Sequence, residues 1–298
     1  MILLAATLLA LAQAHDSTLE RIEERIRKEP GAQIGLAYID LASGDTLFLN
    51  PDSSFHAAST MKVPVMIELF RRSESGSFRM DQGLMLVNQF ASIVDGSAYA
   101  LDPKSDSDST LYHRIGQRVP VDTLLRLMIT RSSNFATNTL ISLVGADAVN
   151  RTMRSLGANR IQVLRGVEDG KAFDKGMNNT TTARDLAIIL KTIEEGRAAP
   201  PEATREMREI LLAQEFNEKI PAGLPAGVRV AHKTGEITAH SHDAAIVYPP
   251  GRKPYVLVVL TRGIQEGAKS SKLIADISSL IYARNSARSG SATVGTAK

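Results

Sequence analysis

Apolar and polar positions alternate near both ends of the chain, which is the pattern of half-buried strands. Gln33 to Asp40 alternates in this way, and the turn at Ser43-Gly44-Asp45 joins it to a second predicted strand at Thr46 to Asn50. The C-terminal part predicts further strands at Val228 to Lys233, Asp243 to Tyr248 and Tyr255 to Thr261. Strand-forming segments therefore occupy both ends of the chain.

The middle of the chain, from about residue 77 to 215, instead follows the three- and four-residue spacing of amphipathic helices. A charged helix from Ser17 to about Lys28 precedes the first strand, and a closing helix is expected at Gly267 to Ala283. The remaining predicted helices are Val63 to Phe70, Val121 to Thr130, Ser133 to Val144, Ala146 to Leu156, Ala183 to Glu194 and Glu202 to Leu212.

This order of elements predicts an α+β fold. We expect one antiparallel sheet, built from both chain ends and covered by the N- and C-terminal helices, beside an all-helical lobe. A single domain would span residues 15–284, with an α/β lobe at about 17–58 and 216–284 and a helical lobe at about 59–215. A cleft between two lobes is a usual place for a binding site.

Composition supports a globular protein and argues against a nucleic-acid partner. Of the 298 residues, 43% are hydrophobic and 22% are charged, which is enough apolar material for a large core. The net charge is only +3, the basic residues are scattered, and Trp is absent. No basic stripe points to nucleic acid.

The two termini differ in character from the rest of the chain. Residues 1–14 resemble a secretory signal, with an apolar run from Ile2 to Leu11 and a cleavage site at Ala12-Gln13-Ala14. That run is too short for a stable membrane anchor, and the absence of Cys excludes a lipid-bearing cysteine or a disulfide. We expect a periplasmic or secreted monomer, with a Ser/Gly/Ala-rich disordered tail at residues 285–298.

The stretch around Ser59 and Lys62 carries the first candidate chemistry. A spacing of three places both side chains on one face at the first turn of an apolar helix. A serine hydroxyl needs a nearby base to act as a nucleophile. A lysine buried against an apolar helix loses hydration, so its pKa falls and it can be that base. The helix N-terminus supplies N–H groups that suit an oxyanion.

Two further short motifs follow in order. Ser132-Ser133-Asn134 opens a helix about seventy residues later, where a hydroxyl can relay a proton and an amide can bind a substrate amide. Lys233-Thr234-Gly235 ends a predicted strand about a hundred residues further on, where a fixed positive charge and a hydroxyl can hold a carboxylate. Gly235 lets a ligand approach the backbone closely. Each motif alone also suits a helix cap or a strand-end turn.

Together the three motifs resemble class A β-lactamases, of the penicillin-recognising serine hydrolase superfamily, over nearly all of the mature length. The matching segments are Ala58-Ser59-Thr60-Met61-Lys62-Val63-Pro64, Ser132-Ser133-Asn134 with Asn138, Asn179-Thr180-Thr181-Thr182, and Lys233-Thr234-Gly235.

The resemblance implies a secreted serine hydrolase that opens the β-lactam ring. Ser59 would attack the carbonyl to form an acyl-enzyme, with Lys62 as proton acceptor or as the group that orients a water. Ser132 would pass a proton to the ring nitrogen. The N–H groups of Ser59 and Glu236 would form the oxyanion hole.

The same resemblance implies how the substrate would be held. Lys233 and Thr234 would bind its carboxylate, and Asn134 its acylamino side chain. The partner is thus a small β-lactam or a cell-wall peptide, and no metal or other cofactor is implied. Whether the enzyme protects its host or trims cell wall stays open.

Two positions near these motifs depart from the family pattern. Ser133 stands where the middle residue of the second motif is usually Asp, so another group must satisfy the partners of that carboxylate. Glu236 is bulkier than the small residue common after K-T-G.

The excursion at residues 165–180 departs further. In the family it carries a Glu that activates the deacylating water, an Asn four residues later, and an Arg–Asp pair across its base. Here Glu168 is the only Glu, Ala172 follows four residues later, and Asn179 removes the expected acid partner of Arg165. Glu168 is the candidate base, or alternatively a solvated loop acid.

Without a working base the acyl-enzyme would be long-lived. The protein would then act as a D-alanyl-D-alanine carboxypeptidase, a penicillin-binding protein or a sensor with slow deacylation.

Two polar stretches suggest other sites. His240-Ser241-His242-Asp243 places two His rings on one face of a strand, as zinc sites do, but no further His-containing motif accompanies it. We favour a role in a loop or at the cleft edge. The acids of Asp102 to Thr110 lack the order of a calcium loop, which favours a solvated connection.

Overall fold

The computed structural model describes the backbone of residues 18–292 and the side chains of residues 18–287. The expected signal segment, residues 1–14, and residues 293–298 of the expected tail lie outside the described residues. No helix in the described part of the chain is long and apolar enough to cross a membrane.

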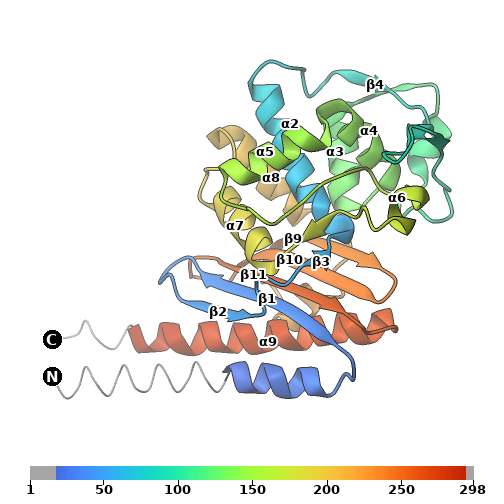
Figure 1. The fold of residues 1–298 in the computed structure, drawn as a ribbon. Coiled ribbons are helices and arrows are strands. Elements are labelled where there is room, and N and C mark those ends of the chain that lie inside the picture. Colours follow the sequence, from blue (N-terminus) through green and yellow to red (C-terminus); the bar gives the residue numbers. More distant parts are fainter. Residues whose placement is uncertain (1–17, 293–298) are drawn as a thin grey trace.

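A five-stranded antiparallel sheet forms from the two ends of the chain, as predicted (Figure 1). In register, Leu36 faces Val259 and Thr234 faces Asp243. The N-terminal pair of strands thus lies beside the three C-terminal ones. The strand order is β2 (Thr46–Leu49), β1 (Gln33–Asp40), β11 (Tyr255–Arg262), β10 (His240–Tyr248) and β9 (Arg229–Ile237).

Helices cover both faces of this sheet because its strands are apolar on each side. On one face, Leu36 and Leu257 pack with Ile22 of the helix at 18–27 and with Ile277 of α9 (Gly267–Ala292). Figure 1 shows these two helices lying together under the sheet. The other face meets the helical lobe through α7 (Ala183–Glu194).

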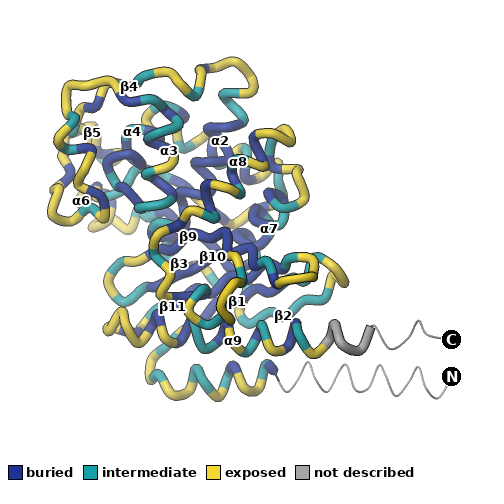
Figure 2. The backbone as a smooth tube through the Cα atoms, turned by 180° about the vertical axis from the view of Figure 1, so that it is seen from behind, coloured by how far each residue is buried: buried dark blue, intermediate teal, exposed yellow. Residues whose placement is uncertain are grey.

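The helical lobe is built around α2 (Lys62–Glu74), which is buried without interruption from Lys62 to Phe70. A helix that is buried on all sides belongs to the core of a lobe. Figure 2 shows the dark-blue buried trace along α2 and where β9 and β10 meet this lobe. Around it pack α3 (Val121–Thr130), α4 (Asn134–Val144), α5 (Ala146–Ser155) and α8 (Pro201–Leu212). The short helix α6 (Gly170–Asp174) lies within residues 165–180.

Short elements connect the larger ones, and the hydrophobic pattern did not reveal them. They are the 3₁₀ turns η1 (Ala58–Met61), η2 (Thr110–Arg114) and η3 (Pro221–Gly223), and the strand pairs β3 (Phe55–His56) with β8 (Thr180–Thr181), β4 (Gly83–Met85) with β7 (Arg118–Pro120), and β5 (Phe90–Ala91) with β6 (Ala98–Tyr99).

Several expected boundaries are wrong, and among them β10 begins at His240 and not at Asp243. Lys233-Thr234-Gly235 does not end a strand, because β9 continues to Ile237 in register with β10. The closing helix does not stop at Ala283 but runs to Ala292, so residues 285–292 of the expected disordered tail are helical.

Candidate active site

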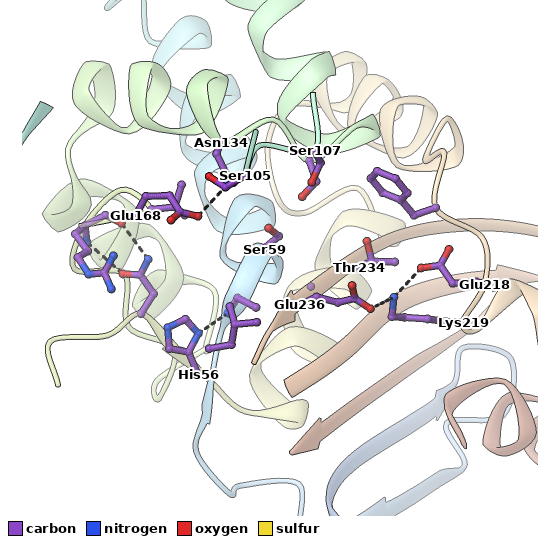
Figure 3. Close-up of a pocket in the computed structure, with 18 residues that line it drawn as sticks. His56, Ser59, Ser105, Ser107, Asn134, Glu168, Glu218, Lys219, Thr234 and Glu236 are labelled. Atoms are coloured by element: carbon purple, nitrogen blue, oxygen red, sulfur yellow. Dashed lines mark hydrogen bonds and ion pairs between the residues drawn. The ribbon is translucent and has the colours of Figure 1, made fainter. Parts of the chain in front are cut away.

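Ser59 lies in the 3₁₀ turn η1, directly before α2. Ala58 takes a positive φ of 45°, and its N–H donates to Nδ1 of His56 at 3.0 Å. The Thr60 hydroxyl donates to the carbonyl of Ala57. Left-handed backbone at a residue with a side chain is costly and tends to occur at functional sites. This tight turn presents Ser59 to a cleft of about 250 Å³ between the two lobes (Figure 3).

Lys62, one turn after Ser59, is fully buried, and polar atoms surround its amine. Its Nζ donates to the carbonyl oxygen of Ser132 at 2.6 Å, to the Ser132 hydroxyl at 3.1 Å and to Oδ1 of Asn134 at 3.0 Å. Burial lowers the pKa of Lys62 to about 7, against the attraction of Asp106 and Glu168. A substantial fraction of neutral amine is therefore available near neutral pH.

Ser132 joins the first and third motifs. Its backbone has a positive φ of 58°, and its hydroxyl also accepts a 3.0 Å hydrogen bond from Nζ of Lys233. Burial, and next the positive charge of Lys62, lower the pKa of Lys233 well below its ordinary value. In the free protein, burial thus disfavours the positive charge that the sequence predicts at Lys233. The convergence of Lys62, Ser132 and Lys233 is as predicted.

Gly235 serves a different contact from the expected one. A Cβ at this position would lie 3.0 Å from the backbone nitrogen of Ser59 and 3.1 Å from that of Thr60. Glycine therefore lets β9 approach the turn that carries Ser59. Thr234 and Glu236 flank Gly235 and line the cleft.

The Glu236 side chain forms an ion pair that no sequence motif predicts. Its Oε1 lies 2.8 Å from Nζ of Lys219, which also pairs with Glu218 at 2.8 Å. Burial acts to lower the pKa of Lys219, but the hydrogen bonds to Glu218 and Glu236 outweigh it, so the pKa is raised. Figure 3 shows this trio on the sheet side of the cleft.

Within the part of the chain that the structure describes, the loop at 165–180 closes without an ion pair at its base. Oδ1 of Asn179 accepts from the N–H groups of Leu164 and Arg165 at 2.8 and 3.2 Å, and its amide donates to the Arg165 carbonyl at 3.0 Å. The Arg165 guanidinium donates instead to the carbonyls of Met177 and Gly166 and to Oδ1 of Asn178. Amide and carbonyl groups thus replace the expected Arg–Asp pair.

Glu168 reaches the cleft from this loop. It is exposed, has a positive φ of 62°, and its Oε1 accepts a 3.3 Å hydrogen bond from the Asn134 amide. Asn138 fixes the preceding residue, because its amide accepts from the N–H of Val167 at 2.6 Å and donates to its carbonyl at 3.0 Å. Gly166 is required there, since a Cβ would lie 2.3 Å from Oδ1 of Asn138.

Asp106 is a site residue that the sequence reasoning missed, because the stretch Asp102 to Thr110 was interpreted as a solvated connection. That interpretation is wrong for Asp106, which accepts hydrogen bonds from the N–H groups of Asn134 and Phe135 at 2.8 and 2.9 Å. No motif marks this acid, and its partners follow almost thirty residues later in the chain.

The His240–Asp243 stretch lies in β10 and is held by the sheet. His242 donates from Nε2 to the His56 carbonyl at 2.8 Å and accepts at Nδ1 from the N–H of Thr261 at 3.2 Å. Both ring nitrogens are used, and burial lowers the pKa of His242 to about 4. Among the described residues, no group of three or more His, Cys, Asp or Glu side chains is placed to hold a metal. His240 lies at the edge of a hollow beside the cleft.

Comparison with known proteins agrees with this architecture. Residues 17–284 match the model of the beta-lactamase enzyme family. A beta-lactamase of Streptomyces albus G is 27% identical over 265 residues, covering 87% of this chain and 82% of that protein. Among solved structures, the beta-lactamase of Sphaerobacter thermophilus has 27% identity and a TM-score of 0.77 over 92% of this chain and 97% of its own.

A second similar structure has a different name. It is a leucine-to-glutamate mutant of PBP-A, solved as an acyl-enzyme complex with penicillin G. Its identity is 27% and its TM-score 0.78, over 90% of this chain and 96% of its own.

Proposed function

This chain belongs to the beta-lactamase enzyme family and is a β-lactam hydrolase of the class A type, and from that premise we propose that it acts through an acyl-enzyme on Ser59. The observation that carries the proposal is the Ser132 hydroxyl, which accepts hydrogen bonds from both Lys62 and Lys233 beside the Ser59 turn. One segment thus supplies the nucleophile Ser59 and the base Lys62, a second supplies the proton relay Ser132, and a third supplies Lys233.

In the acylation step, neutral Lys62 accepts the proton of Ser59, directly or through a water, as the hydroxyl oxygen bonds to the lactam carbonyl carbon. The negative charge that develops on the carbonyl oxygen is met by the N–H groups of Ser59 and Glu236; one such donor is worth roughly 3 kcal/mol of barrier. The C–N bond then breaks, and the proton passes from Lys62 through the Ser132 hydroxyl to the ring nitrogen. The 3.1 Å contact between Lys62 and Ser132 supports this relay.

Substrate binding uses the same walls of the cleft. Lys233 and Thr234 would hold the substrate carboxylate, and Asn134 its acylamino group. An anion beside Lys233 favours the ammonium form of this lysine. Binding would therefore raise the pKa of Lys233, against the effect of burial.

For deacylation we propose Glu168 as the base that activates a water. Its carboxylate lines the cleft and is held by the Asn134 amide at 3.3 Å. The second candidate function, a penicillin-binding protein or carboxypeptidase with slow deacylation, is favoured by one observation. Ala172 stands where the family has an amide side chain, so this position cannot help to orient the water.

Turnover and labelling separate the two functions. We expect wild-type protein to hydrolyse a chromogenic cephalosporin and to retain no label from a fluorescent penicillin. Glu168→Gln should acylate at a near wild-type rate and retain the label. Ser59→Ala should show neither signal, and Ser54→Ala, which changes an exposed serine on the same segment, should match wild type.

Each other outcome has a defined meaning. Lasting label with little turnover in wild type would favour the carboxypeptidase or sensor. Unchanged turnover in Glu168→Gln would remove Glu168 from the mechanism. Neither turnover nor label at high protein concentration would contradict the acyl-enzyme proposal.

We also propose that residues 1–14 direct export and are removed. Expression with its natural start in a bacterial host should give a periplasmic or secreted protein whose first residue follows Ala14. N-terminal sequencing that recovers Met1 from the cytoplasm would contradict this.

A further inference from the structure

The start of α4 carries the second motif and lacks the carboxylate that the family pattern has in its middle. Ser133 is fully buried and caps the helix, where its hydroxyl accepts from the N–H of Ala136 at 3.3 Å. A serine hydroxyl cannot also satisfy the N–H groups of Asn134 and Phe135, which precede that one. Another acceptor must satisfy them.

Asp106 supplies that acceptor from a different segment. Its Oδ1 accepts from the N–H of Asn134 at 2.8 Å, and its Oδ2 accepts from the N–H of Phe135 at 2.9 Å and from the Tyr112 hydroxyl at 2.9 Å. The Tyr112 ring also packs on Phe135, with ring centroids 4.9 Å apart. One carboxylate therefore ties the loop before η2 to the first turn of α4.

We propose that Asp106 is a positioning residue for catalysis, which performs from the neighbouring loop the task of the acid that the family pattern places at the Ser133 position. The inference rests on the proposed function. It follows from the chain of contacts: Asp106 holds the backbone of Asn134, and the side chain of Asn134 contacts both Lys62 and Glu168. Loosening this turn would displace the partners of the base and of the deacylating acid together.

The charge of Asp106 also acts on Lys62. Asp106 and Glu168 are the acids that act on this buried amine, and Lys233 faces it from β9 through the shared Ser132 hydroxyl. Asp106 raises the pKa of Lys62 against the effect of burial. Neutralising Asp106 should therefore lower the pKa of Lys62. The acylation rate would then begin to fall at a lower pH as the solution is made more acidic. A purely structural role for Asp106 would lower the rate without changing the pH at which this fall begins.

The matched pair for the test is Asp106→Asn and Asp108→Asn. Asp108 is a buried acid of the same loop, but its carboxylate accepts from Thr110 and lies 3.9 Å from Arg131. Its backbone N–H donates to Oδ1 of Asp106 at 3.2 Å, and the substitution leaves that N–H in place. In Asp106→Asn an NH₂ group replaces one carboxylate oxygen and cannot accept a hydrogen bond. The N–H of Asn134 or of Phe135 therefore loses its acceptor.

We expect the acylation rate of Asp106→Asn, measured with a fluorescent penicillin from pH 5 to 9, to fall roughly 10- to 100-fold, with its acidic midpoint at lower pH. Asp108→Asn should keep both the rate and the midpoint. Asp106→Glu keeps the negative charge but changes the hydrogen-bond geometry, so its acylation rate should fall while its acidic midpoint stays at the wild-type pH. This variant replaces Asp106→Asn in the test if Asp106→Asn does not fold.

Wild-type rate and midpoint in Asp106→Asn would overturn the inference, as would an equal loss in Asp108→Asn. Hydrogen exchange at the backbone amides of Asn134 and Phe135 distinguishes failure of the Asp106 inference from failure of the proposed function, because the exchange measurement does not depend on enzyme activity. If wild type is never labelled, the acyl-enzyme proposal fails. The Asp106 contact itself still stands if these amides exchange faster in Asp106→Asn, and falls if they do not.

Discussion

Lys233 donates a 3.0 Å hydrogen bond to the hydroxyl of Ser132 across the cleft between the lobes. This bond joins the middle of β9 to the start of α4, over 101 residues of sequence. Because the same hydroxyl accepts from Lys62, two buried amines share one acceptor. The cleft therefore holds two neighbouring lysines, and the positive charge of Lys62 lowers the pKa of Lys233.

The first prediction concerns the pH dependence of acylation. Lys62 accepts a proton only when neutral, and burial lowers its pKa to about 7. The acylation rate should therefore rise with pH through a midpoint near that value. Lys62→Arg should abolish acylation, since arginine stays protonated. Stopped-flow measurements from pH 5 to 9 check this, and a flat profile would argue against Lys62 as the base.

The second prediction concerns the base of the 165–180 loop. Asn179→Asp should destabilise the protein by about 1–3 kcal/mol, because a carboxylate oxygen replaces the amide that donates to the Arg165 carbonyl. The matched variant is Asn178→Asp, which places an acid where the Arg165 guanidinium already donates at 3.1 Å. It should be neutral or stabilising. Urea unfolding of both variants tests the pair, and the opposite order would mean that the loop closes as in other family members.

The third prediction concerns the acidic wall of the cleft. Glu236→Gln removes a negative charge that pairs with Lys219, and Lys219 also lines the cleft. We expect KM for a penicillin, which carries a carboxylate, to fall roughly fivefold, corresponding to about 1 kcal/mol of relieved repulsion. The comparison variant is Glu218→Gln, which removes the other ion-pair partner of Lys219 and leaves residues 233–236 unchanged. A higher KM in Glu236→Gln would show that its carboxylate helps to bind substrate.

Local patterns predicted much of the fold. The bounds of α3 and α7 match because their apolar stripes begin and end sharply, and Thr182 caps α7 by accepting from the N–H of Asp185 at 3.1 Å. The three motifs also converge as expected, since each fixes its residues at the start of a helix or within a strand. The placement of strands at both chain ends also predicted one antiparallel sheet, but not the order of its strands.

Contacts between distant segments could not be predicted in this way. The length of β9 depends on its pairing with β10, where Gly235 faces His242 beyond the expected strand end. Asp106 and Lys219 acquire their roles only through partners on other elements, and a single acid or lysine in a polar stretch carries no periodic signal. The tertiary fold, not the local sequence, makes them part of the site.

The proposed mechanism requires a covalent intermediate on Ser59, which mass spectrometry of the intact protein detects. After brief exposure to penicillin G, Glu168→Gln should gain the mass of one intact penicillin, and peptide mapping should place the adduct on Ser59. Ser59→Ala should gain nothing under the same conditions. An adduct on another residue, or an equal adduct in Ser59→Ala, would contradict this mechanism.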